Sequence, residues 1–270
     1  MFVSRVLTGA VLTLILVLVV WFSHIPAVLN AFIAFLSVKG ISELYKATGL
    51  HNRKIITAVS YILAIVLSFV TIPGNRYIVA VLFVLSLVLF AFLMRTVKTK
   101  QTVEPVLSII IAAFIVFFFK TLSDIRNIKK GIFLLGATML VPILTDIFAY
   151  LCGKGFGKHK LAPLLSPKKT IEGSISGTVC ATSMLMLVAD ILSKYNIISV
   201  SHIKLFIYLI LASLAGQFGD LAFSSVKRIV KIKEYGKLLP GHGGILDRFD
   251  SMLFTAPFSY LFCSFTELIF

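Results

Sequence analysis

Charged residues are scarce in this sequence. Asp, Glu, Lys and Arg make up only 14% of its 270 residues, whereas they form about a quarter of an ordinary soluble domain. Hydrophobic residues reach 59%, and the mean hydropathy is +1.02. These values exclude a cytosolic globular enzyme and a disordered chain. They indicate a membrane protein.

Cysteine is also rare, since Cys152, Cys180 and Cys263 are the only three in the chain. So few cysteines exclude a disulfide scaffold, and their spacing matches no metal-binding motif. Each lies in or beside an apolar run, so we expect three buried thiols.

Acidic residues are the scarcest charged class. The 11 Asp and Glu residues stand against 26 Lys and Arg, which gives a formal net charge of +15. Because charge is costly in lipid, we expect the basic residues in the loops, where they suit anionic lipid headgroups, a polyphosphate substrate, or both. No separate basic domain is present, so nucleic acid is not an expected partner.

Apolar runs of about 20 residues, the length that spans a bilayer, predict an all-α polytopic integral membrane protein with about nine transmembrane helices. We expect a single membrane domain over residues 1–270, with about five spans in residues 1–131 and the catalytic motifs in residues 132–270. The first run is longer than a signal-peptide core and has no clear cleavage site, so it counts as a span. The predicted spans are residues 6–23, 27–44, 55–72, 77–94, 103–119, 132–151, 173–193, 203–223 and 250–270.

The distribution of Lys and Arg predicts a cytoplasmic N-terminus in the inner membrane, because the loops that would then face the cytoplasm are far richer in these residues. The C-terminus of this multi-pass chain would face outward. One segment disagrees, and there either the segment is interfacial or the predicted span ends are wrong. Its outward-facing cations would be Lys120, Arg126, Lys129 and Lys130.

Five acidic residues fall close to the ends of the last four predicted spans, on the predicted cytoplasmic side. Asp220 is the most informative, because an Asp near a helix C-terminus meets the negative end of the helix dipole and needs a cation. Lys227 and Arg228 would serve, as would a metal ion, and we favour the metal because other carboxylates accompany it. The five are Asp146, Glu172, Asp220, Asp247 and Asp250.

The other acidic residues have simpler interpretations. Asp247 and Asp250 are three residues apart on one helix face, and helix capping explains either of them equally well. Glu43, at the inner end of the second span, is expected to form a structural salt bridge rather than to belong to the site. We expect loop or interfacial positions for Glu104, Asp124, Asp190 and Glu267.

Two loops ahead of the seventh span have the composition of a phosphate site. Residues 153–160 combine three glycines with three lysines, which would let backbone N–H and ammonium groups approach phosphate oxygens, although the P-loop spacing is absent. Residues 166–170 lead into a helix N-terminus, itself an anion site. A basic membrane-surface loop explains the same composition. Gly173 and Gly177 are expected to serve close helix packing.

The most specific loop is residues 240–250, where a proline and three glycines surround His242. This composition predicts a tight turn with accessible backbone donors. The turn leads directly into Asp247 and Asp250, so donors, a base and carboxylates meet in one segment. His242 is expected to be a structural hydrogen-bond partner or a phosphate contact rather than a proton shuttle.

These residues closely resemble the signature of the phosphatidate cytidylyltransferase family, also called CDP-diacylglycerol synthases. The signature covers residues 224–250 and reads here SSVKR, then KEYG, then LPGHGGILDRFD. Two upstream segments, DIFAY at 146–150 and SPKKTIEG at 166–173, also resemble family motifs. Glu234 departs from the signature, because the family has Asp at this position.

The resemblance implies transfer of CMP from CTP to phosphatidic acid, which gives CDP-diacylglycerol and pyrophosphate, with Mg²⁺ or another divalent cation, at the cytoplasmic membrane face. It also implies roles for individual residues. Metal ligands would be Asp220 and Asp247, with Asp250 and Asp146 as the next candidates. The catalytic candidates are Asp220, Asp247, Asp250, His242, Lys227 and Arg228, and the substrate-binding candidates are Asp146, Lys168, Lys169, Glu172, Lys233, Gly243, Gly244 and Arg248.

A polytopic transporter or carrier of a phosphorylated lipid is the alternative from another class. Transporter sites lie near the bilayer midplane, whereas the acidic residues here collect at one predicted membrane face, which disfavours this alternative. A phosphotransferase acting on CDP-alcohols or polyprenyl phosphates ranks behind, since its Asp spacing is absent. The small residues of span 173–193 permit a homodimer interface.

Overall fold

A computed structural model describes residues 2–70, 75–99, 102–241 and 243–266 of the chain. The chain divides into two compact units. Unit 1 comprises residues 1–124 and 225–250, and unit 2 comprises residues 125–224 and 251–270. The expected division at residue 131 stays a prediction, but the signature segment 225–250 groups with the N-terminal helices.

Seven helices within the described residues are long and apolar enough to cross a membrane, as expected for an all-α multi-pass membrane protein. They coincide with seven of the predicted spans. The other two predicted spans correspond to shorter apolar helices, α3 (Lys54–Phe69) and α10 (Met252–Thr266). Nine crossings and a cytoplasmic N-terminus therefore stay predictions.

Unit 1 contains the N-terminal helices and the signature segment. α2 begins with Pro26 in its first turn, where the missing N–H costs nothing, and ends at Gly49, whose φ of +79° is a left-handed conformation that suits glycine. The elements of unit 1 are α1 (Phe2–Trp21), η1 (Phe22–His24), α2 (Pro26–Thr48), η2 (Leu50–Asn52), α3, α4 (Arg76–Thr96), α5 (Pro105–Arg126) as far as Asp124, the end of α8 (His202–Ile229) from Ser225, and α9 (Leu246–Phe249).

The short helix α9 packs against α2 and α5. The ring centroid of Phe249 is 6.4 Å from that of Phe32 and 6.2 Å from that of Phe119, both in the edge-on arrangement that aromatic pairs favour. Gly40 on α2 lies beside Leu246, where a larger residue would meet the Leu246 side chain. This packing holds the C-terminal end of the signature segment against two helices.

The structure corrects the predicted loop that begins at residue 120. α5 continues to Arg126, so Lys120 lies within a helix, and only 4% of it is exposed. Its Nζ is 2.8 Å from Asp124 Oδ1, and the Asn75 amide donates to Asp124 Oδ2 at 2.7 Å. Asp124 is therefore a buried ion-pair partner and not a loop residue. Pairing offsets the cost of the buried charges, which lets the helix continue through them.

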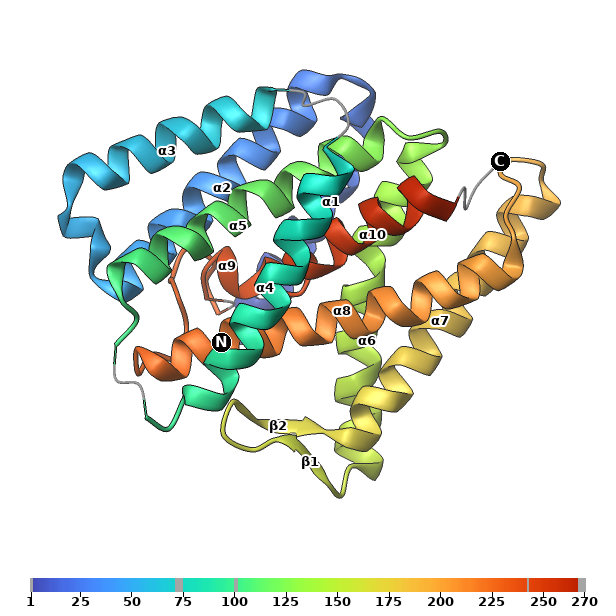
Figure 1. Ribbon diagram of the computed structural model, residues 1–270. Coiled ribbons are helices and arrows are strands. Elements are labelled where there is room, and N and C mark those ends of the chain that lie inside the picture. Colours follow the sequence, from blue (N-terminus) through green and yellow to red (C-terminus); the bar gives the residue numbers. More distant parts are fainter. Residues whose placement is uncertain (1, 71–74, 100–101, 242, 267–270) are drawn as a thin grey trace. The chain divides into compact units, whose positions relative to one another are not determined.

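Unit 2 is built around two long helices joined by a hairpin (Figure 1). The two predicted loops ahead of the seventh span are partly wrong. Residues 153–156 belong to a helix, and residues 166–170 form a strand. α8 also continues past its predicted end, so Lys227 and Arg228 lie on a helix and not in a loop. The elements of unit 2 are α6 (Gly131–Phe156), the antiparallel strands β1 (Lys160–Ala162) and β2 (Ser166–Thr170), α7 (Ile171–Lys194), α8 as far as Ser224, and α10.

Glycines bring α6 and α7 into close contact. A Cβ at Gly177 would lie 2.7 Å from the Thr145 carbonyl oxygen and 2.8 Å from Ala149 Cβ. A Cβ at Gly173 would lie 2.7 Å from the Ala149 carbonyl oxygen. The predicted packing role of both glycines is confirmed, and the contact they serve is within the chain.

Hydroxyl and amide side chains join α6, α7 and α8 inside unit 2. Ser213 Oγ lies 2.9 Å from both Thr145 Oγ1 and Thr178 Oγ1. Gln217 Nε2 donates to Thr178 Oγ1 at 2.8 Å. Such bonds help to hold helices together in lipid, where the hydrophobic effect does not drive helix association. The network fixes the stretch of α8 that leads to Asp220.

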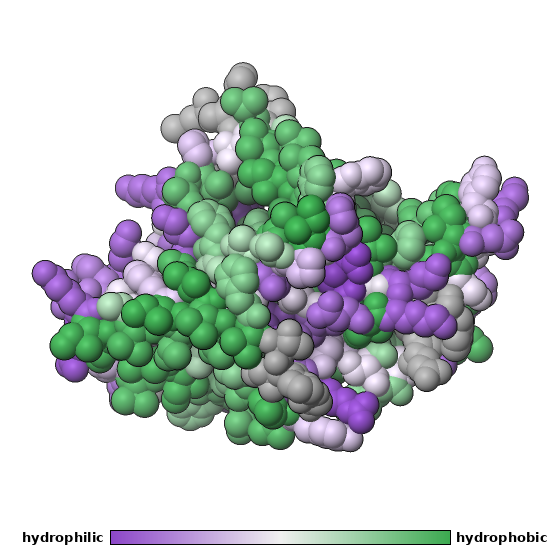
Figure 2. Space-filling view, turned by 90° about the horizontal axis from the view of Figure 1, so that it is seen from above, coloured by the Kyte–Doolittle hydropathy of each residue, from purple (hydrophilic) through white to green (hydrophobic). Residues whose placement is uncertain are grey.

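Many large apolar side chains are exposed. Figure 2 shows hydrophobic residues over broad areas of one face, with hydrophilic residues gathered into patches. Exposed apolar area on this scale is expected where a surface meets lipid. Examples from several helices are Trp21, Ile55, Val106, Phe156 and Ile203.

The cysteines show that an apolar run does not bury every residue in it. Cys263 is buried, as expected. Cys152 and Cys180 are only half-buried, so the prediction of three buried thiols is wrong for these two. Each lies on a helix that also presents an exposed apolar surface.

We expect Gly177→Ala to destabilise the protein and Gly136→Ala to leave its stability unchanged or slightly raised. A methyl group at Gly177 would overlap Thr145 and Ala149, whereas a methyl group at Gly136 meets no atom within 4 Å. The expected loss for Gly177→Ala is about 1–3 kcal/mol, measured as a lower midpoint of thermal unfolding in detergent. Equal midpoints for the two variants would contradict the close helix contact.

Candidate active site

Six of the predicted site residues form two clusters, one in each unit. The Lys169 cluster, in unit 2, consists of Asp146, Lys169 and Asp220. The Asp247 cluster, in unit 1, consists of Lys227, Asp247 and Asp250. Each cluster joins a lysine to two carboxylates, so the ammonium group compensates one of the two negative charges.

The Lys169 cluster draws one residue each from α6, β2 and α8. Lys169 Nζ is 3.8 Å from Asp146 Oδ1 and forms a closer ion pair with Asp220 Oδ2. Half of the Asp146 side chain is exposed, against a fifth of Asp220. The ammonium group thus lies at two carboxylates that are open to solvent or ligand. The cation that Asp220 was expected to need is Lys169 in this structure.

Strand β2 turns its two lysines in different directions. Successive side chains of a strand point to opposite faces, and Lys169 is half-buried at the carboxylates while Lys168 is exposed. The hairpin is anchored at its base by Glu172, whose carboxylate accepts the His159 backbone N–H at 3.2 Å and lies 2.6 Å from His159 Nδ1. Glu172 therefore positions the hairpin, while Lys168 is available to bind an anion.

The Asp247 cluster is more deeply buried. Asp247 Oδ1 is 2.9 Å from Lys227 Nζ, and only 4% of the Asp247 side chain is exposed. Its Oδ2 accepts the backbone N–H groups of Tyr235 at 2.7 Å and Gly244 at 3.0 Å. Asp250 Oδ2 lies 3.9 Å from the same ammonium group. Lys227 thus pairs with two buried carboxylates. Asp247 links Tyr235 to Gly244 within residues 230–246, which we call the signature loop.

Tyr235 completes the surroundings of Lys227. Lys227 Nζ lies 5.5 Å from the centroid of the tyrosine ring, within the range of a cation–π contact. Burial, together with the nearby charges of Asp250 and Asp247, raises the pKa of the Tyr235 phenol well above its usual value. The phenol therefore stays neutral at physiological pH and adds no negative charge to the cluster.

The predicted tight turn is present around residues 239–243. Leu239 and Gly243 exchange backbone hydrogen bonds of 2.9 and 3.1 Å, and Gly241 and Gly243 have φ of +75° and +83°. These positive angles suit glycine. The N–H groups of Gly243 and Gly244 are engaged within the loop and are not open donors. His242 lies outside the described residues.

The remaining basic candidates differ in accessibility. Lys233 and Arg248 are exposed, and Arg228 is half-buried. Exposed cations suit the recognition of phosphate oxygens, Arg as a planar fork and Lys as a point charge.

Two of the carboxylates fit a divalent cation better than the others. Among the described residues, no group of three or more His, Cys, Asp or Glu side chains is close enough to share a metal ion, but Mg²⁺ needs only one or two carboxylates when substrate phosphates supply the rest. Asp146 and Asp220 meet that condition, since both are partly exposed and already share a cationic group. Asp247 is buried, and both of its oxygens are engaged.

Glu43 does not form the expected salt bridge within the described part of the chain. Its Oε1 and Oε2 instead accept the backbone N–H groups of Ile245 at 2.9 Å and Leu246 at 2.8 Å. One signal of this contact is visible in the amino-acid sequence, because Glu43 is the only acidic residue of residues 26–48, a largely apolar segment.

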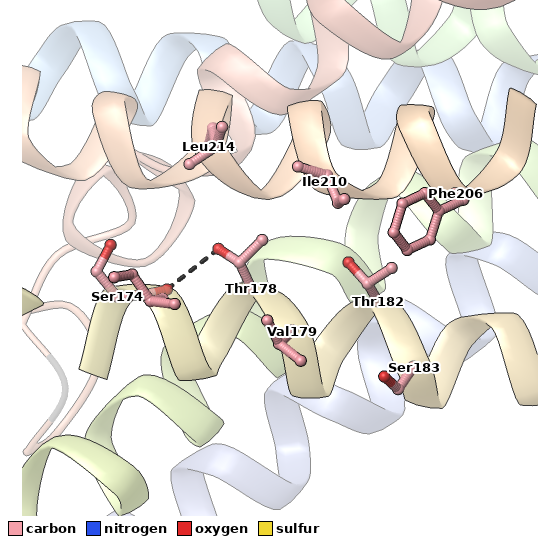
Figure 3. Close-up of a pocket in the computed structure, with 9 residues that line it drawn as sticks. Ser174, Thr178, Val179, Thr182, Ser183, Phe206, Ile210 and Leu214 are labelled. Carbon is pink, nitrogen blue, oxygen red and sulfur yellow. Dashed lines mark hydrogen bonds between the residues drawn. The ribbon is translucent and has the colours of Figure 1, made fainter. Parts of the chain in front are cut away.

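Unit 2 also has an apolar pocket of about 300 Å³ between α7 and α8 (Figure 3). Thr178, Thr182, Ile210 and Phe206 line it, and Thr178 Oγ1 donates to the Ser174 carbonyl oxygen at 3.1 Å. No lining residue is charged, so the pocket suits hydrocarbon and not a nucleotide.

Comparisons with known proteins agree with the signature. The model of the family described as the cytidylyltransferase family matches residues 3–266. A phosphatidate cytidylyltransferase of Staphylococcus saprophyticus is 44% identical over 128 residues, which are 47% of this chain and 48% of that protein. One of Bacillus subtilis is 41% identical over 143 residues, which are 53% of this chain and 52% of that protein. The chain thus aligns with about half the length of these relatives.

We expect Lys227→Met to destabilise the protein far more than Lys237→Met. Without Lys227, the buried Asp247 and Asp250 carboxylates lose the ammonium group that balances them, and breaking a buried pair costs about 3–5 kcal/mol. Lys237 is an exposed lysine of the loop that follows α8. Denaturant unfolding in detergent would measure both, and similar midpoints would show that the Lys227 pairs add little to stability.

Proposed function

This chain belongs to the cytidylyltransferase family, and from that premise we propose that it transfers CMP from CTP to phosphatidic acid, giving CDP-diacylglycerol and pyrophosphate. Relatives named phosphatidate cytidylyltransferase support this choice of substrates. The structural observation that carries the proposal is the Asp247 cluster, in which the signature segment folds around a buried carboxylate held by Lys227.

In the proposed reaction, a phosphate oxygen of phosphatidic acid forms a bond to the α-phosphorus of CTP. The bond from that phosphorus to the pyrophosphate oxygen breaks. No strong base is required, because a phosphate monoester is already anionic at pH 7. Catalysis then depends on orientation of the two substrates and on neutralisation of the charge that develops on pyrophosphate.

The basic residues have different roles in the proposed reaction, according to how exposed their side chains are. Lys168, Lys233 and Arg248 are exposed and would bind phosphate oxygens. Arg228, which is half-buried, would also bind them. Lys227 is engaged with Asp247 and Asp250, so its part is to hold the carboxylates of the signature segment. Gly243 and Gly244 shape the turn, because their N–H groups bond within the loop.

We propose Mg²⁺ or another divalent cation as the cofactor. Asp220 and Asp146 would hold it, and Lys169, which lies at both carboxylates, would then be released toward an anionic substrate. Asp247, the second ligand expected from the sequence, would need to give up contacts to Lys227 or the backbone. The bound ion would neutralise charge on the leaving pyrophosphate.

The proposed site faces the cytoplasm at the inner membrane. The support is the excess of Lys and Arg in the segments predicted to be cytoplasmic. The cytoplasm is also the compartment that supplies a nucleotide. A homodimer stays a prediction, since Gly173 and Gly177 serve a contact within the chain.

We expect purified protein to release pyrophosphate only when phosphatidic acid, CTP and Mg²⁺ are supplied together, with ATP as the inactive nucleotide control. Asp220→Asn should lower this rate by about 100-fold, the usual scale for removal of one electrostatic contact to a transition state. Asp190→Asn is the matched control, because Asp190 is a half-exposed carboxylate that lies 3.3 Å from a side-chain nitrogen, His202 Nδ1.

Three outcomes would contradict this proposal or a part of it. Equal release with ATP, or release without lipid, would exclude CMP transfer to phosphatidic acid. Full activity of Asp220→Asn would remove the Lys169 cluster from the reaction.

A further inference from the structure

Glu43 is a buried acidic residue in a membrane-spanning helix. It is 7% exposed, and α2 places it among apolar residues such as Leu44 and Ile41. A carboxyl group in such a place is costly unless its oxygens are hydrogen-bonded. Both oxygens are satisfied, and both donors come from the signature loop, 202 and 203 residues further along the chain.

Two glycines of the loop make the contact possible. A Cβ built at Gly236 or at Gly244 would overlap the Glu43 carboxyl group. The loop backbone therefore approaches Glu43 more closely than any residue with a side chain would permit. Both glycines belong to the signature segment. The lack of side chains at these two positions therefore leaves room for the Glu43 carboxyl group.

Two carboxyl groups share the backbone at the start of α9. The Gly244 N–H is donated to Asp247, and the next two N–H groups, of Ile245 and Leu246, are donated to Glu43. Such N–H groups at a helix start have no partner within the helix. Glu43 thus fixes the two residues that immediately precede Asp247.

The loop has little regular structure. Among the described residues between Val230 and Ile245 there is no helix, and one isolated bridge joins Leu239 to Gly243. The Pro240 carbonyl accepts the Thr8 hydroxyl at 3.1 Å, and the Tyr235 N–H is donated to Asp247. The two bonds to Glu43 hold the residues immediately before Asp247, so they help to set the orientation of the Asp247 side chain toward Lys227.

We infer that Glu43 is a positioning residue for the proposed transfer reaction. It anchors Ile245 and Leu246 to α2, and this anchor keeps Asp247 bonded to Lys227. The inference rests on the proposed function for the reaction concerned, but the anchor itself is a property of the fold and is measured without turnover.

The test compares Glu43→Gln with the wild-type chain in lipid nanodiscs. The glutamine amide group has one oxygen that accepts and one nitrogen that only donates, so one of the two loop N–H groups loses its acceptor. Glu104→Gln is the matched control, because Glu104 is exposed. Hydrogen exchange is read by mass spectrometry on peptides that contain Ile245 and Leu246, and on peptides from α2.

We expect exchange of the loop peptides to rise by about tenfold in Glu43→Gln, the effect of one unsatisfied buried donor, while the α2 peptides stay close to wild type and the unfolding midpoint falls only slightly. The kcat for CTP and phosphatidic acid should fall by about 100-fold, and the KM for CTP should change by less than about threefold, because Glu43 binds no substrate. Glu104→Gln should match wild type in every measurement.

A double-variant cycle provides a second readout. Gly236→Ala inserts a methyl group into the space of the Glu43 carboxyl group, so it should accelerate loop exchange in the wild-type background. In the Glu43→Ala background the carboxyl group is gone and the Gly244 Cα at 3.1 Å remains, so the added effect of Gly236→Ala should be smaller than in the wild-type background. Non-additivity of this kind identifies direct contact.

The outcomes separate the two proposals. Unchanged loop exchange in Glu43→Gln, or additive effects of Gly236→Ala, would overturn the anchor. Faster loop exchange with wild-type kcat would overturn the positioning role. Absence of turnover by the wild-type chain would overturn the proposed function alone, and the exchange data would still decide whether Glu43 holds the loop.

Discussion

The cost of a charge or an unpaired polar group away from water is the constraint on which the rest of this structure depends. Lys120 is acceptable inside α5 because Asp124 lies beside it. Lys227 is acceptable near the end of α8 because Asp247 balances it. The Lys227–Asp247 pair also joins α8 to α9. The Lys120–Asp124 pair joins two residues that are four apart on α5.

The same constraint explains the part played by backbone N–H groups. The signature loop has little regular structure of its own, and its donors must find acceptors. Asp247 takes the N–H groups of Tyr235 and Gly244, and Glu43 takes two more. Carboxyl groups in this chain therefore serve as structural acceptors as well as candidate reaction groups, and glycines such as Gly236 are needed where a carboxyl group meets the backbone.

Much of the fold was predictable because bilayer thickness fixes the length of an apolar run. Long helices were therefore placed correctly, but several of their ends were not. The predicted ends at residues 119 and 223 lie before Lys120 and Lys227, whereas α5 and α8 continue through these two lysines. A helix continues through a charged residue when a partner neutralises it, and the partner is not visible in a local window of sequence.

The class of protein, the approximate helices and the residue types of the site follow from the amino-acid sequence, because composition and motif spacing are local properties. The folded chain sets which residues pair. It placed Lys169 at Asp220 from a hairpin strand, and it placed Glu43 at Leu246 across 203 residues. Every residue except proline carries a backbone N–H, so no pattern of side chains marks which donor a distant carboxyl group will meet.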